Sequence, residues 1–81
     1  MAMRLTPVES TTFTLIGYDV DRAVLRLEFR DRRTYEYYGV PADEHEHLLR
    51  SPSKGSYFNR AIRGRFAYAR VSGQGNQPSL S

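Results

Sequence analysis

The segment Tyr35-Glu36-Tyr37-Tyr38-Gly39-Val40-Pro41 marks the place where the chain is predicted to change from strands to helices. Its aromatic residues favour a β-strand, which ends at Val40-Pro41 because proline donates no hydrogen bond to a sheet. Proline is also common at helix starts. Asp43 and Glu44 follow in what would be the first helical turn, where carboxylates complement the helix dipole. The fold is therefore expected to divide near Pro41.

The residues before this segment predict antiparallel strands. Residues 11–18 are rich in threonine and large apolar side chains, and a break in their alternation predicts a bulge or bend near Gly17. Residues 23–30 alternate regularly, with Leu25, Leu27 and Phe29 on one face and charged side chains on the other. With residues 34–38, these segments predict a three-stranded antiparallel meander that has one apolar face.

Two helices are predicted after the strands. The first ends near Arg50, because the residue before Pro52 avoids helical angles. The second begins at Ser53, a good N-cap, and ends at Gly64. We expect an α+β domain over residues 1–71, in which both helices pack on one sheet face. The sheet gains a fourth strand if residues 66–71 return to it, and residues 72–81 are expected to form a disordered C-terminal tail.

Length and composition limit the class of protein. Eighty-one residues make one domain, without cysteine and without an apolar run near the roughly 20 residues that span a membrane. We therefore expect a soluble cytoplasmic protein that contacts no membrane. The net charge is +3, and only one of the twelve basic residues is a lysine. An arginine bias is typical of nucleic-acid binding, and it is also what a GC-rich genome produces.

Three motifs stand in order along residues 7–71. Ile16-Gly17-Tyr18-Asp19 comes first, and Tyr35-Glu36-Tyr37 with Val40-Pro41 stands in the centre. The third motif consists of Ser53, Gly55, Tyr57, Phe58, Asn59, Ile62 and Arg63. In these motifs the chain resembles the KTSC family, a small domain named after the C-terminus of some lysyl-tRNA synthetases and also found alone in bacterial and phage proteins. The resemblance implies no established activity, and RNA binding is the function usually suggested for the family.

This chain departs from that pattern at one turn. It has Arg32-Arg33 where many relatives have a glycine, which leaves the type of that turn open.

The tyrosines of the central motif have two possible positions. Tyr35 and Tyr37 share one face of their strand, so they form either a base-stacking platform or part of the core. Glu36 points the other way, and burying an unpaired carboxylate is costly. We therefore place both tyrosines in the core. The family motif also includes Pro41, Tyr57, Phe58 and Ile62. Tyr18 and Tyr38 are the candidates for stacking on a base, provided that they are exposed.

The second predicted helix carries the candidate phosphate contacts. At its start, Lys54, Gly55 and Ser56 combine a charge, free N–H groups and room for close approach. Along its polar side lie Asn59, Arg60 and Arg63, continued by Arg65 and Arg70. The alternatives are a serine cap with a glycine for tight packing, and an ordinary solvated helix face.

No metal site, cofactor or catalytic group is expected. His45 and His47 are two apart on a helix, so they face different ways and cannot chelate one ion. No local motif joins a nucleophile, a histidine and an acid. We expect a non-enzymatic module that binds RNA or another phosphate-rich ligand. The alternatives are a protein-interaction or homodimerisation module that uses the open sheet face or edge, and a nucleotide-sequestering protein.

Overall fold

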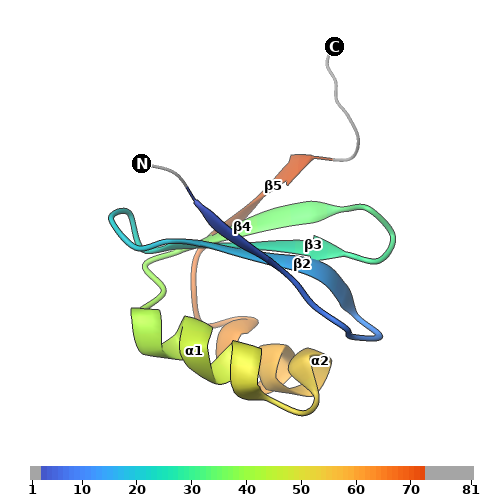
Figure 1. Ribbon diagram of the computed structural model, residues 1–81. Helices are drawn as coiled ribbons and strands as arrows, with labels where there is room; N and C mark the ends of the chain where they lie inside the picture. The colour runs from blue at the N-terminus through green and yellow to red at the C-terminus, as the bar shows by residue number, and fades with distance from the viewer. Residues whose placement is uncertain (1–2, 73–81) are drawn as a thin grey trace.

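The protein is an α+β domain with one five-stranded antiparallel sheet (Figure 1). The computed structural model describes residues 3–72. The strands are β1 (Arg4–Pro7), β2 (Phe13–Asp19), β3 (Val24–Phe29), β4 (Thr34–Tyr38) and β5 (Tyr68–Ser72). Their order in the sheet, β1-β2-β3-β4-β5, follows the chain. The predicted meander is confirmed and is larger than expected: β5 is the optional extra strand, and β1 was not predicted.

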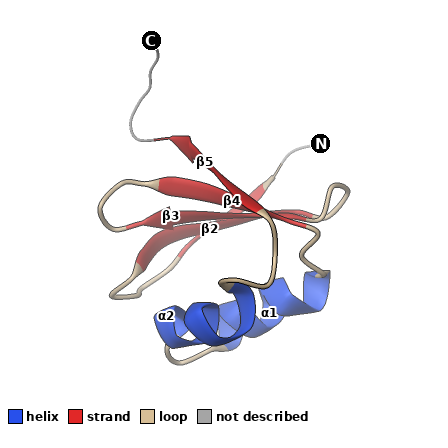
Figure 2. Cartoon of the chain, turned by 180° about the vertical axis from the view of Figure 1, so that it is seen from behind, coloured by secondary structure: helices blue, strands red, loops and turns tan. Residues whose placement is uncertain are grey.

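The helices pack together on one face of the sheet, as predicted (Figures 1 and 2). They are α1 (Ala42–Arg50), α2 (Lys54–Tyr57) and η1 (Phe58–Ile62). Between this helical layer and the sheet lies the core, whose fully buried side chains are Phe13, Ile16, Leu25, Leu27, Leu48, Ile62 and Val40. We call the covered side of the sheet the inner face and the opposite side the outer face.

The second helical segment is less regular than a single α-helix. Its last turn is a π-turn, in which the Arg63 N–H donates to the Phe58 carbonyl at 2.8 Å. Gly64 has φ +80° and follows the extended Arg63, and the Arg65 N–H donates to the Ile62 carbonyl at 3.0 Å. This is a type II turn, which needs a residue with positive φ at its third position. Gly64 therefore ends the helix, as expected.

The predicted bulge is misplaced. The pairing of β2 with β3 shifts between Phe13 and Leu15, rather than near Gly17. Gly17 has a different constraint: a Cβ there would lie 2.7 Å from Leu5 Cδ2 and 2.8 Å from Met3 Sδ. The side chains of Met3, just before β1, and of Leu5, within β1, therefore pack directly over Gly17 on the outer face.

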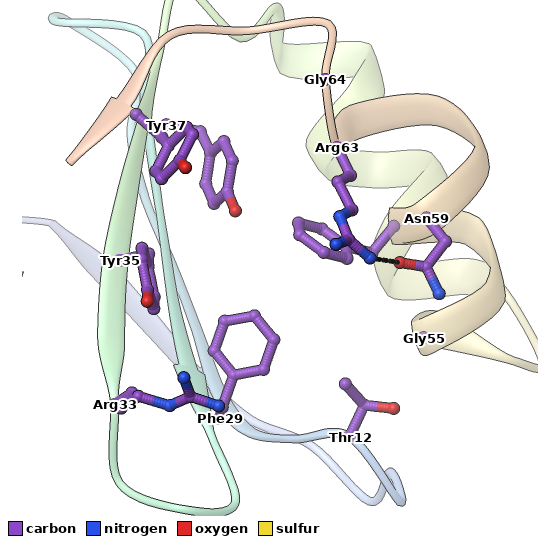
Figure 3. Close-up of a pocket in the computed structure, with 11 residues that line it drawn as sticks. Thr12, Phe29, Arg33, Tyr35, Tyr37, Gly55, Asn59, Arg63 and Gly64 are labelled. Carbon is purple, nitrogen blue, oxygen red and sulfur yellow. Dashed lines mark hydrogen bonds between the residues drawn. The ribbon is translucent and has the colours of Figure 1, made fainter. Parts of the chain in front are cut away.

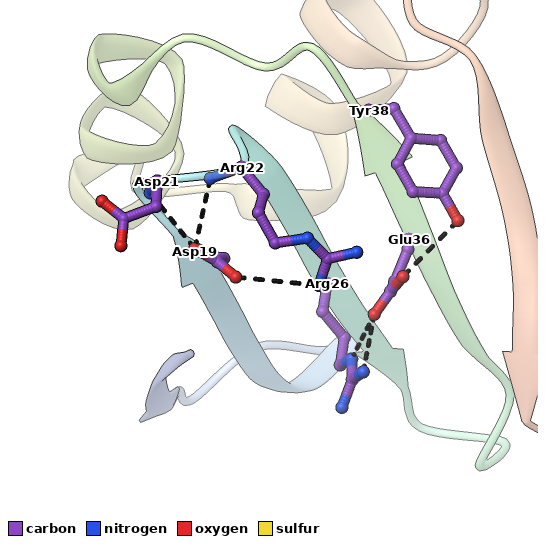
Figure 4. Close-up of polar contacts among 6 residues, drawn as sticks. All are labelled: Asp19, Asp21, Arg22, Arg26, Glu36 and Tyr38. Atoms are coloured by element: carbon purple, nitrogen blue, oxygen red, sulfur yellow. Dashed lines mark hydrogen bonds and ion pairs between the residues drawn. The ribbon is translucent and has the colours of Figure 1, made fainter. Parts of the chain in front are cut away.

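The outer face carries charged side chains, as predicted, although Glu36 is buried there. Arg26 donates to Glu36 Oε2 from Nη2 at 2.6 Å and from Nε at 3.0 Å, and the Tyr38 hydroxyl lies 3.4 Å from Oε1 (Figure 4). These neighbours leave Glu36 only 9% exposed. Since opposite charges pair here, the outer face is a poor surface for a polyanion.

Candidate functional site

A groove of about 320 Å³ opens beside the helical layer at the β4–β5 end of the inner face. Its floor is aromatic and consists of Phe29, Tyr35, Tyr37, Phe58 and Tyr68. Its rim is polar and consists of Thr12, Arg33, Gly55, Asn59, Arg63 and Gly64. Figure 3 shows Tyr35 and Tyr37 on the strand side, facing Asn59 and Arg63 on the helical side across open space.

The aromatic floor is most accessible to solvent at Tyr68. The ring of Tyr68 stacks on Tyr37, with centroids 5.3 Å apart and planes at 26°, and lies 5.8 Å from Tyr35. Tyr68 is 59% exposed, whereas Tyr37 is 5% exposed and meets the edge of Phe58. Tyr68 is therefore the most exposed of the aromatic residues that line the groove.

The hydroxyl of Tyr37 stays neutral at ordinary pH. Burial raises the pKa of this hydroxyl, the neighbouring Tyr68 and Tyr35 raise it further, and Arg63 opposes them. The groove thus offers a neutral hydroxyl rather than a phenolate.

The rim of the groove is positive. Arg63 donates to Asn59 Oδ1 at 3.4 Å, and within residues 3–72 no carboxylate lies within 4 Å of it. Arg33 is paired with Asp31, and this contact lowers the pKa of the Asp31 carboxyl. The lining itself contains no acidic residue. A ligand in the groove would therefore meet aromatic rings and uncompensated positive charge together.

The predicted phosphate-contacting residues do not all reach this groove. Gly55, Asn59 and Arg63 line it. Arg60 lies instead over the ring of Tyr57, 5.4 Å from its centroid. Three further candidates lie outside the lining: Ser56 and Arg65, which are exposed, and Lys54, which donates to the Ser51 carbonyl at 3.1 Å.

The start of α2 serves packing more than ligand approach. A Cβ on Gly55 would lie 2.3 Å from Thr12 Oγ1, so the glycine lets α2 contact the loop before β2. Ser53 is the N-cap residue but makes no side-chain cap hydrogen bond, and its hydroxyl donates to Ser56 Oγ at 3.0 Å.

The prediction that Tyr18 could stack on a base is wrong. Its side chain is 7% exposed, its hydroxyl donates to the Val40 carbonyl at 2.6 Å, and its ring stacks on His45 at 4.6 Å. One face of the ring is thus covered by His45, and too little of the side chain is exposed for a base to stack on it. Tyr38 is 37% exposed on the outer face, so its stacking stays a prediction.

The other residues of the central and third motifs have separate functions in the fold. Tyr35 and Tyr37 point to the inner face, as predicted, and Phe58 and Ile62 are buried. Pro41 is exposed and forms the N-cap of α1, so it belongs to the helix start rather than to the core. Tyr57 is half-buried and donates to Glu44 Oε1 at 2.6 Å. This hydrogen bond, followed by burial and the Glu44 charge, raises the pKa of Tyr57 to about 12.

Charge is divided along the chain. Every Asp and Glu lies at or before Glu46, and the later basic residues are Arg50, Lys54, Arg60, Arg63, Arg65 and Arg70. Within the part of the chain that the structure describes, Arg50 alone of these six has a carboxylate within 4 Å, that of Glu46. The chain from Lys54 onward, which forms α2, η1 and β5, therefore presents positive charge without carboxylate partners among the described residues.

The histidines are separated, as the helical spacing predicted. His45 is buried and His47 is exposed. Among residues 3–72, no three His, Cys, Asp or Glu side chains are grouped so that they could hold a metal ion. No helix in the same range is long and apolar enough to cross a membrane.

The chain is similar to members of one known protein family. The family model of the KTSC domain matches residues 9–66. Lysine–tRNA ligases from Trichormus variabilis and Nostoc punctiforme are 40% and 33% identical over 72 residues, which are 89% of this chain and 13% of each ligase. The chain thus spans about an eighth of the ligases that it matches. A protein from Tsukamurella paurometabola is 37% identical over 76% of this chain and 92% of its own length.

A solved structure supports the same relationship. The crystal structure of a KTSC domain protein from Yersinia pestis is similar with a TM-score of 0.84 and 38% sequence identity, over 88% of this chain and all of that one.

Proposed function

Because this chain belongs to the KTSC domain family, we propose that it is a non-enzymatic module that binds RNA. Lysine–tRNA ligases are among its relatives, so the family includes proteins whose names specify an RNA substrate. A cytoplasmic location is part of the same proposal.

One observation carries the proposal: the unpaired basic side chains of the second half. Arg60, Arg63 and Arg65 are exposed, and in the described chain none has a carboxylate within 4 Å. A guanidinium group that is already paired must give up its partner before it binds phosphate, whereas these need not. Arg63 stands at the rim of the groove, so phosphate contacts there would lie beside aromatic rings. Rings beside basic side chains are the usual arrangement in proteins that bind single-stranded nucleic acid.

The test is the double substitution Arg60→Glu with Arg63→Glu. We expect weaker binding to a tRNA and to a single-stranded RNA. We also expect the salt dependence of log K to become shallower by about 0.7 for each phosphate contact that is lost. Both side chains are exposed, so the fold should persist. Fluorescence anisotropy at several NaCl concentrations measures affinity and slope together.

The matched control is Arg22→Glu with Arg50→Glu. These side chains are 70% and 77% exposed, and each already has a carboxylate partner. The control changes the net charge by the same amount in a different place. Equal loss of binding in both double variants would show that only net charge matters, and a wild-type affinity independent of salt would contradict the proposal.

A second candidate function is self-association through the sheet edges. β1 and β5 are the edge strands of the sheet, and the exposed Leu5 and Val71 lie on them. Open strand edges can pair with another chain. Sedimentation equilibrium over a hundredfold range of concentration decides this: a constant monomer mass excludes self-association, and a mass that rises with concentration supports it.

A further inference from the structure

The chemistry of the groove limits what it can bind. Aromatic walls suit two kinds of group, a quaternary ammonium ion or a flat ring. A cation would meet Arg63 at the rim, and within residues 3–72 no carboxylate within 4 Å offsets the charge of Arg63, whereas Arg33 is paired with Asp31. A flat ring that carries an anionic group is not repelled in this way, because the anionic group is attracted to the arginine at the rim. A nucleotide has this combination of a planar base and a phosphate.

We propose that the groove binds one unpaired base of a single-stranded RNA, stacked on Tyr68, with the adjoining phosphate on Arg63. This inference rests on the proposed RNA binding and adds to it a site and a preference for single strands. Tyr68 is the most exposed aromatic residue in the groove, since it is 59% exposed while its neighbour Tyr37 is almost covered. Base stacking on tyrosine is a common means of holding single strands.

Asn59 stands where it can contact the edge of such a base. It lines the groove beside Arg63, and its Oδ1 accepts the hydrogen bond from that guanidinium. Its side-chain nitrogen makes no hydrogen bond to any residue between 3 and 72. That amide therefore keeps a free donor for an oxygen or ring nitrogen of the base.

The size of the groove excludes a double helix. About 320 Å³ is at the lower end of the range for small-molecule pockets, roughly 300–1,000 Å³, which suits one nucleotide. In a duplex the base is stacked and paired, and it must leave the helix before a side chain can stack on its face. An unpaired base can enter without that cost.

The experiment compares three ligands on the full chain: a six-nucleotide single-stranded RNA, a blunt-ended RNA duplex without a loop and inorganic polyphosphate. The variant is Tyr68→Ala. The control is Tyr38→Ala, which removes a partly exposed tyrosine from the outer face. We expect Tyr68→Ala to weaken the single-stranded RNA about 5- to 150-fold, as loss of one stacked base does, and to leave duplex and polyphosphate binding unchanged. Tyr38→Ala should change none of the three affinities.

A second variant tests the site without disturbing the sheet. Asn59→Ala changes an exposed side chain and should weaken single-stranded RNA with no effect on polyphosphate. Amide and ring chemical shifts should move at Asn59 and Tyr68 when adenosine monophosphate is added to the wild type.

The outcomes separate the inference from the proposal beneath it. If the wild type binds duplex and single strand equally and Tyr68→Ala has no effect, the groove proposal is wrong while RNA binding stands. If the wild type binds no RNA and no polyphosphate, both are wrong. Tighter binding of a trimethyl-lysine peptide than of any RNA would assign the groove to cations and overturn the inference. Saturable binding of adenosine monophosphate that is as tight as that of the six-nucleotide RNA would assign the groove to a free nucleotide, which also overturns it.

Discussion

At the scale of single residues, the most constrained polar group is the imidazole of His45. The ring is 6% exposed and stacks on Tyr18 with planes 9° apart. Within residues 3–72 its Nε2 is buried without a hydrogen-bond partner. Burial lowers the pKa of His45 because it opposes the charged form, Glu46 acts in the other direction, and Arg4 lowers the pKa a little further. The folded protein therefore holds this ring neutral.

Stability should fall in acid because of this ring. The unfolded chain binds the proton near pH 6.5, above the pKa of the folded state. The contribution of the neutral His45 ring to the free energy of unfolding is therefore fully present above pH 6.5. It is lost as the pH falls through the pKa of the folded state. His45→Phe keeps the stack without the titration, so its free energy of unfolding in urea should drop less between pH 7.5 and pH 5 than that of the wild type. His47→Phe, at an exposed position, is the control, and an equal drop in all three proteins would contradict the explanation.

The residue predictions succeeded where a local rule applied and failed where a distant partner decided. Tyr35 and Tyr37 face inward because Glu36 between them must point outward, which two-residue periodicity shows. The burial of Tyr18 depends on the Val40 carbonyl, 22 residues further along the chain, and no local pattern shows that. Tyr68 was missed because residues 66–71 have too little alternation to indicate a face.

At the scale of elements, the contact between α2 and the loop before β2 requires a glycine. The ideal Cβ position on Gly55 is 2.3 Å from Thr12 Oγ1 and 3.3 Å from Thr12 Cβ. A side chain there would push α2 away from the sheet, and with it the rim of the groove. The position of α2 thus depends on the absence of a side chain at residue 55.

Gly55→Ala should therefore lower the free energy of unfolding by about 1–3 kcal/mol, the usual cost of overpacking. Thr12→Ala removes the closest atom, so the double variant should recover most of that loss even though Thr12→Ala alone has little effect. A urea double-mutant cycle measures this coupling. Additive effects of the two substitutions would show that the contact does not position α2.

The prediction of elements was limited by tertiary pairing. β1 contains Pro7 and has only one large apolar residue, Leu5, so its strand structure comes from pairing with β2 rather than from propensity. The helix was predicted as regular up to Gly64, and the π-turn at its end was missed because a 100° wheel assumes uniform turns. The sequence identified only the helical side of the candidate site. The helical wheel picked out Arg63 and Asn59, but it carries no information on which strand residues lie opposite them.

At the scale of the whole molecule, the division of charge is the basis of the proposed polyanion binding. All acidic residues precede residue 47, and a ligand on the second half relieves the repulsion among like charges there. A ligand that binds only the folded state raises the melting temperature. Tripolyphosphate at about five times its dissociation constant should raise it by roughly 4–8 °C.

Sodium chloride at the same ionic strength is the control for this shift, because it screens charge without bridging it. Arg60→Glu with Arg63→Glu should abolish the tripolyphosphate shift and keep the response to sodium chloride. A shift of the same size from both salts in the wild type would mean that screening alone is responsible. Differential scanning calorimetry gives these values without any RNA.

The order of the strands has a consequence for when the groove exists. β1 to β4 pair through short loops, whereas β5 joins β4 only after the chain has passed through both helices. Late loop closure makes β5 the strand expected to join the sheet last, and like β1 it has a single neighbour. The Tyr68 side of the groove thus lies on an edge strand that joins the sheet late. A ligand that contacts both Tyr68 and Arg63 would therefore hold β5 against the helical layer and stabilise its attachment to the sheet.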